Sequence, residues 1–181
     1  MRKSQIGLII AVLLLITISA GVTVALLVAS SNPVINTFTV GGVDITLNET
    51  TGEQYIMTPG VAVAKDPVIT VLANSERSWL FVKLEKKNDF DNYCTYELRE
   101  GWSALPGQPG VFCRMVEKTS TDQVFEVLKD NCIFIKSTLT EEQLNAVTQL
   151  PTLTFTAYAV QNDGFATPED AWRAVNEGRE G

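Results

Sequence analysis

The stretch that decides the fold is VINTFTVGGVDITLNET, residues 34–50. Apolar residues alternate with polar ones along it, and a period of two predicts a half-buried β-strand. Gly41-Gly42 breaks the alternation, which indicates a bulge or a tight turn. Two apolar sets stand on either side of this break, Phe38 and Val40 before it and Val43, Ile45 and Leu47 after it. We expect residues 43–47 to belong to a sheet of the protein's own domain.

Short strand patterns also dominate the rest of the chain. WLFVKL, residues 79–84, is apolar at almost every position, which predicts a strand buried between layers. LPGQPG, residues 105–110, is typical of turns. Further strands are expected at 67–72, 93–98, 111–116, 132–136 and 153–160. Many short strands separated by turns predict a mainly β fold, a jelly-roll-like antiparallel β-sandwich that spans residues 42–181.

Two short helices are expected at the margin of this fold. Thr140-Glu141-Glu142-Gln143 has the pattern of a capping box, in which the threonine and glutamine side chains bond each other's backbone. Thr167-Pro168-Glu169-Asp170 begins a second helix, with proline at the first helical position and acidic residues in the first turn. Trp172 and Val175 would form the inward face of that helix.

The N-terminus predicts export from the cytoplasm. Arg2 and Lys3 precede an uncharged apolar run from residue 6 to residue 29. This pattern fits a signal peptide over residues 1–25 with cleavage after Ala25, and Ala29 is a second candidate position. The alternative is a retained membrane anchor, because about 20 apolar residues cross a bilayer. In both cases the positive N-terminus stays inside and the remaining chain lies outside.

Composition excludes several classes of function. Removing residues 1–25 takes away two basic residues and no acidic ones, so the formal charge of −7 becomes −9. We therefore expect no nucleic-acid binding. The chain has no histidine and no glycine-rich phosphate loop, and we expect no enzyme activity, no cofactor and no metal site. The acidic run 88–92 lacks the later glycine and glutamate of a calcium loop, so a solvated loop is expected there. Cys94, Cys113 and Cys132 are an odd number, which leaves one disulfide or none.

The sequence resembles the TasA/camelysin-like family of exported proteins, whose signal peptides are processed by a dedicated type I signal peptidase of the SipW kind. The resemblance spans nearly the whole chain. Its motifs are Asn36-Thr37-Phe38 with Gly41, then Pro59-Gly60 with Lys65-Asp66-Pro67, and finally Ala157-Tyr158-Ala159-Val160-Gln161 with Gly164-Phe165 and Ala171-Trp172. The family implies a jelly-roll β-sandwich, secretion to the extracellular matrix or cell surface, and assembly into biofilm fibres. It also allows other matrix proteins as co-assembling partners.

In this family the N-terminal segment of one subunit inserts as a strand in its neighbour. The resemblance therefore implies a flexible donor segment over residues 26–41, with Val34, Ile35, Phe38 and Val40 as the donor-strand residues. The alternative is that this stretch is the first strand of its own domain. At the level of function, the alternative is a surface β-sandwich that binds a partner without polymerising. Camelysin-like members are classed as metallopeptidases, but this chain has no His-Glu-x-x-His motif, so that activity is not expected here.

Overall fold

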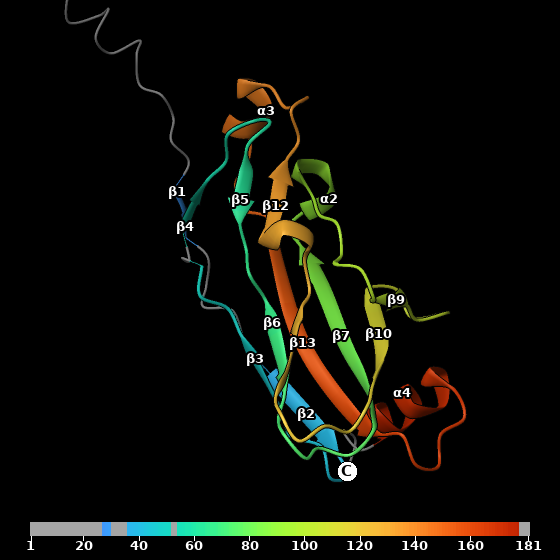
Figure 1. Ribbon diagram of the computed structural model, residues 1–181. Coiled ribbons are helices and arrows are strands. Elements are labelled where there is room, and N and C mark those ends of the chain that lie inside the picture. Colours follow the sequence, from blue (N-terminus) through green and yellow to red (C-terminus); the bar gives the residue numbers. More distant parts are fainter. Residues whose placement is uncertain (1–26, 30–35, 52–53, 178–181) are drawn as a thin grey trace, which may run out of the picture.

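The computed structural model describes residues 27–29, 36–51 and 54–177. These residues form a mainly β fold with several sheets, as the strand patterns predicted (Figure 1). The expected N-terminal helix and the cleavage position at Ala25 lie outside the described residues, as do Val34 and Ile35.

The largest sheet has five strands in the order β2-β13-β7-β10-β9. Its centre is the antiparallel pair of the two ten-residue strands, β7 and β13, which run beside each other over their whole length. β13 is largely buried on both faces, and so is β7 over residues 78–84, as WLFVKL predicted, whereas residues 85–87 of β7 are exposed. The strand bounds are β2 Asn36–Val40, β7 Ser78–Lys87, β9 Ser103–Ala104, β10 Val111–Val116 and β13 Thr152–Gln161.

A second sheet packs against one face of the first. It has the order β11-β6-β3, with β3 Ile45–Asn48, β6 Val68–Val71 and β11 Gln123–Glu126. The main core lies between the two sheets, where Val43, Ile45 and Leu47 meet the inward residues of β7 and β13. Residues 43–47 therefore belong to the domain's own sheet, as the alternation predicted.

Two smaller sheets complete the strands. One has the order β5-β12-β8, with β5 Ala62–Ala64, β8 Cys94–Thr95 and β12 Cys132–Ile135. The other is the pair β1–β4, with β1 Leu27–Ala29 and β4 Gln54–Ile56. The expected strand 93–98 is thus reduced to two residues and a single bridge between Leu98 and Leu128.

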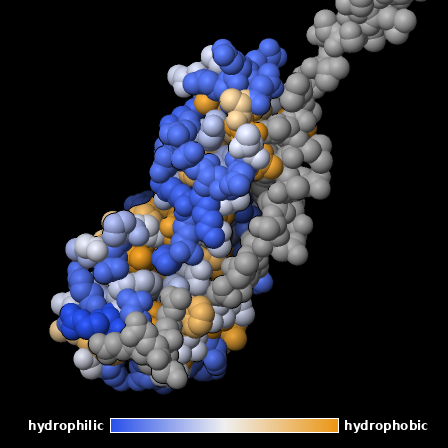
Figure 2. Space-filling view, turned by 180° about the vertical axis from the view of Figure 1, so that it is seen from behind, coloured by the Kyte–Doolittle hydropathy of each residue, from blue (hydrophilic) through white to orange (hydrophobic). Residues whose placement is uncertain are grey.

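The helices are short and lie at the margins. α3, Glu141–Asn145, begins with the predicted capping box, in which Thr140 and Gln143 exchange side-chain-to-backbone hydrogen bonds. α4, Pro168–Glu177, buries Trp172 and Val175 against the outer face of the five-stranded sheet, as expected. A 3-10 helix spans Lys129–Asn131. Figure 2 shows the molecule from behind, with a band of hydrophilic residues in which apolar ones are scattered.

Two expectations need correction. The segment 88–92 is not an open loop, because α2, Phe90–Tyr93, forms there and buries Phe90 in the main core. The strands are not all antiparallel, because β2 runs parallel to β13. Parallel pairing needs a long crossover connection, and here that connection is residues 41–151, which contain most of the domain.

Candidate functional site

The expected donor segment contains β2, which lies at the edge of the five-stranded sheet (Figure 1). Its parallel register places Asn36 opposite Thr156 and Val40 opposite Val160. The other end of the sheet is formed by β9, so β13 is the only strand that pairs with β2 among the described residues. An edge strand has one row of backbone groups in a ladder and one row outside it. β2 is therefore held by half of the pairing that a central strand has.

Phe38 is the side chain of β2 whose contacts anchor the strand. Its ring stacks on the ring of Tyr158, with 5.3 Å between the ring centroids and 15° between the planes. Tyr158 in turn packs edge-on against Trp172 of α4 at 5.1 Å. Phe38 nevertheless leaves 41% of its surface exposed. Because complete burial of a phenylalanine is worth about 1.5–3 kcal/mol, this partial burial contributes roughly 1–2 kcal/mol.

A sharp turn at Gly41 separates β2 from β3. Gly41 has φ +86°, a conformation that glycine adopts readily and other residues rarely do. A Cβ atom there would lie 2.7 Å from the Cβ of Gln161. The next amide, that of Gly42, donates a hydrogen bond to Oε1 of Gln161 at 3.3 Å. The turn predicted from the glycine pair is confirmed, and it carries the chain from the edge of one sheet into the other.

The N-terminal segment also makes a second pairing, which the sequence reasoning missed. β1 pairs antiparallel with β4, with Leu27 opposite Ile56 and Ala29 opposite Gln54. No further described strand joins this pair. A two-stranded pair is marginal in water by itself. The apolar run Tyr55-Ile56-Met57 was the available signal for β4, but it is short and has no alternation.

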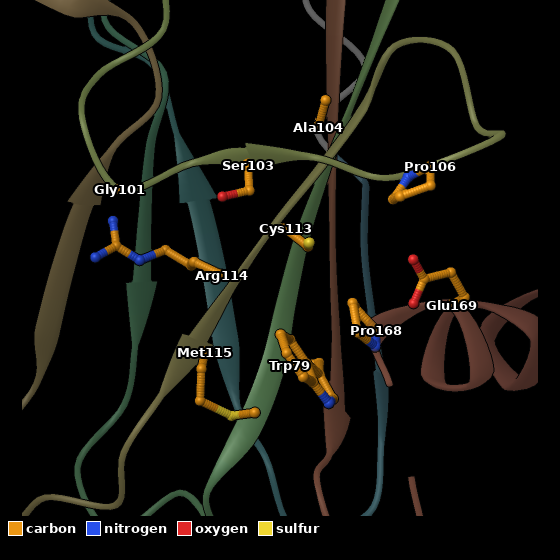
Figure 3. A pocket seen from close by; sticks show the side chains of 10 residues that line it. All are labelled: Trp79, Gly101, Ser103, Ala104, Pro106, Cys113, Arg114, Met115, Pro168 and Glu169. Atoms are coloured by element: carbon orange, nitrogen blue, oxygen red, sulfur yellow. The ribbon is translucent and has the colours of Figure 1, made fainter. Parts of the chain in front are cut away.

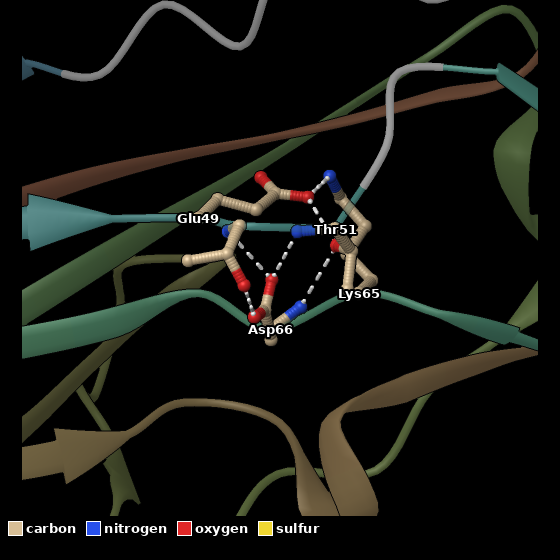
Figure 4. A network of polar contacts seen from close by, with 5 residues as sticks. Glu49, Thr51, Lys65 and Asp66 are labelled. Carbon is tan, nitrogen blue, oxygen red and sulfur yellow. Dashed lines mark hydrogen bonds and ion pairs between the residues drawn. The ribbon is translucent and has the colours of Figure 1, made fainter.

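A polar network fixes the chain between β3 and β4 (Figure 4). Asp66 accepts hydrogen bonds from the backbone amides of Thr50 at 2.9 Å and Thr51 at 2.8 Å, and from the hydroxyl of Thr50. Burial alone would raise the pKa of the Asp66 carboxyl, but these hydrogen bonds lower that pKa to about 2. Lys65 forms an ion pair with Glu49, and the two side chains are only 10% and 5% exposed.

This network gives a physical role to Lys65-Asp66-Pro67, one of the motifs on which the family resemblance rests. A buried ion pair requires both partners, because an uncompensated charge away from water is strongly destabilising. Sequence reasoning did not connect Glu49 with Lys65, since their contact depends on how β3 and β6 pair. The network ties down the chain only a few residues before β4 begins.

The three cysteines are buried free thiols. Burial raises the pKa of Cys94 to about 11, and burial also raises the pKa values of Cys113 and Cys132. The disulfide that the cysteine count left open is not formed. Within the described residues, no three His, Cys, Asp or Glu side chains gather as a metal-binding group.

Over residues 27–29, 36–51 and 54–177, no helix has both the length and the apolar character needed to cross a bilayer. Comparison of the chain with protein-family models, with curated proteins and with solved structures finds no match.

Proposed function

We propose that this protein is an exported structural subunit of extracellular biofilm matrix fibres. In this proposal residues 1–25 are a signal peptide, removed by a dedicated type I signal peptidase, and the rest is a jelly-roll-like β-sandwich. Subunits join when the N-terminal segment of one, with Val34, Ile35, Phe38 and Val40, inserts as a strand in the next. Other matrix proteins co-assemble with it in the extracellular matrix or at the cell surface.

The observation that carries this proposal is the edge position of β2. It pairs with one strand, and its largest described side chain is 41% exposed. If β2 of a second copy takes the same place beside β13, the same hydrogen bonds and the same contact between Phe38 and Tyr158 form between subunits. The exchange then costs little enthalpy. A head-to-tail contact of this kind need not close on itself, so it produces a filament.

Two further features support exchange. The turn at Gly41 lies directly after β2, so a change in backbone direction there would point the whole donor segment, residues 26–41, away from its own sheet. The pair β1–β4 has no third strand among the described residues, so little pairing has to be broken to free the segment before β2.

A second candidate function is a surface module that binds a partner without polymerising. The observation that favours it is that β2 already pairs with β13 within one chain, over five residue pairs. If β2 stays in the sheet of its own chain, it cannot act as the donor strand for a neighbouring subunit.

Electron microscopy of two purified forms separates these functions. One form contains residues 26–181 and the other begins at Gly41. Filaments from the longer form alone are the expected result. Filaments from both forms would keep the fibre and reject strand insertion by residues 26–40. Monomers from both forms, at high concentration and over a range of pH, would favour the non-polymerising module.

A further inference from the structure

A half-buried arginine that has no ion-pair partner among the described residues lies on the second strand from the end of the five-stranded sheet opposite to β2. Arg114 is on β10, and its guanidinium points toward the second sheet. There its central carbon lies 4.2 Å from the ring centroid of Phe125 on β11 and 5.5 Å from that of Trp102. These contacts between a cation and aromatic faces stabilise the charge in part. They supply no hydrogen-bond acceptor.

One hydrogen-bonding group of Arg114 is unsatisfied within the described part of the chain. Its Nε is buried and has no hydrogen-bond partner there. Burial lowers the pKa of Arg114. Glu126, which lies close by, is paired with Arg99 at 3.5 Å and accepts a hydrogen bond from Asn131 at 3.0 Å. Because arginine stays charged in proteins, this is a partly desolvated cation with no ion-pair partner among the described residues.

The chain leaves open space beside this cation. A hollow of about 500 Å³ is lined by Arg99, Glu100, Arg114, Val124, Phe125 and Glu126. A second hollow, of about 450 Å³, reaches Arg114 from the other side of β10, next to Gly101 and Ser103 (Figure 3). Gly101 has φ +96°, and a Cβ there would lie 3.2 Å from Nη2 of Arg114. The glycine therefore keeps the space around the guanidinium free.

Two strand edges border the first hollow. β9 pairs only with Phe112 and Cys113 of β10, so the stretch from Arg114 to Val116 has β7 as its only strand neighbour among the described residues. β11 pairs only with β6 in the same part of the chain. On β11, Val124 leaves 64% of its surface exposed. The indole N–H of Trp102 donates a hydrogen bond to the Glu126 carbonyl at 2.9 Å, so the edge of β11 that is left for a partner lies around Val124. A strand edge with free backbone groups accepts an added strand through backbone hydrogen bonds.

We propose that the opening between β10 and β11 binds an extended peptide segment of a partner protein, with one carboxylate of that segment placed on Arg114. The guanidinium supplies a fork of donors that suits a carboxylate, and the edge of β11 supplies backbone groups. Apolar side chains next to the acid would cover Val124. This site is separate from β2 and does not depend on fibre assembly.

The charge of the chain sets the kind of peptide. The formal net charge is −7, and Glu100 is exposed at the rim of the hollow. A strongly acidic segment is repelled before it reaches Arg114. A segment with a single acidic residue among β-branched residues can still form the charge pair with Arg114, and the negatively charged chain repels it less. Uronic-acid polymers share the carboxylate, but they have no amide backbone to pair with a strand edge.

The test measures peptide binding to the full chain in mild detergent, by titration calorimetry and by tryptophan fluorescence, for which Trp102 is a reporter beside the site. The probes are the capped peptide TVTDVTV and its matched form with Asn in place of Asp. We expect the Asp peptide to bind about tenfold more tightly, or more, because a hydrogen bond to a charged group is stronger than one to a neutral group. Equal binding of the two peptides, or no binding of the Asp peptide at 1 mM (about the weakest affinity of interest), would overturn the proposal.

Variants locate the site. Arg114→Gln should abolish the preference for Asp, whereas Arg77→Gln, at an exposed pair with Glu117, should not. Val124→Asp should weaken binding of the Asp peptide more than Val124→Lys does, because both lose the apolar contact but only the new carboxylate repels the acid of the peptide; both keep the fold because Val124 is exposed. If these two Val124 variants bind alike, the peptide does not lie on β11. If oligogalacturonate binds in an Arg114-dependent way and the peptide does not, the ligand is a sugar acid and the peptide assignment is wrong.

Discussion

Replacement of Phe38 by alanine tests how weakly β2 is held. The substitution removes a partly buried ring, worth roughly 1–2 kcal/mol from its buried area. It also removes the stacked contact with Tyr158, worth about 0.5–1.5 kcal/mol for an aromatic pair. We therefore expect detachment of β2 to become easier by roughly 1.5–3.5 kcal/mol. The remainder of the domain keeps its main core, since Phe38 is not among the residues of the cluster between the two sheets.

Amide hydrogen exchange measures this detachment directly. A change of 2 kcal/mol lowers the protection of the β2 amides by about 30-fold. Phe134→Ala is the matched control, because Phe134 is also 41% exposed but lies on β12, which pairs on both sides. It should leave the exchange of β2 unchanged. Unaltered exchange at residues 37–40 in Phe38→Ala would refute the reasoning, and so would equal loss of protection over the whole domain.

Three further substitutions test the turn and the polar network. Gly41→Ala should destabilise the domain by about 1–3 kcal/mol through its positive φ and the close contact of the new Cβ, whereas Gly42→Ala should cost less in the same urea titration. Glu49→Gln alone should lower the free energy of unfolding by about 3 kcal/mol or more, because it leaves the buried Lys65 ammonium unpaired. The double variant Glu49→Gln, Lys65→Met should recover much of this stability, as measured by thermal unfolding. The pKa of Asp66 is lowered from 3.8 to about 2, so its ionised carboxylate stabilises the fold above pH 4, and this contribution is lost as the pH falls toward 2. Asp66→Asn should therefore reduce the loss of folding stability between pH 5 and pH 2.5. An unchanged pH dependence of stability in this variant would contradict the assignment.

Local signals in the sequence predicted the elements that depend on local chemistry. The capping box at Thr140 and the proline start of α4 need only a few consecutive residues, and both helices are present. The long alternation in residues 153–160 likewise predicted β13. These patterns work because their periods reflect which face of one element is buried.

Other features depend on contacts between distant segments, and no local pattern carries them. The parallel pairing of β2 with β13 joins segments about 120 residues apart, and nothing in NTFTV distinguishes a parallel from an antiparallel neighbour. β11 was missed because Val124 faces outward and the flanking residues are only half-buried, so its alternation is weak. The position of Arg114 next to Phe125 follows from how the two sheets pack, which the sequence alone could not predict.

The burial of the three thiols bears on how chains in the proposed fibre would be held together. Disulfide exchange requires a thiolate, and with the pKa of Cys94 at about 11 almost none is present near neutral pH. An odd cysteine count would ordinarily favour covalent cross-links between chains in an oxidising medium. Here all three cysteine sulfurs are buried within the domain, so we expect chains of the proposed fibre to separate in denaturant alone, without a reducing agent.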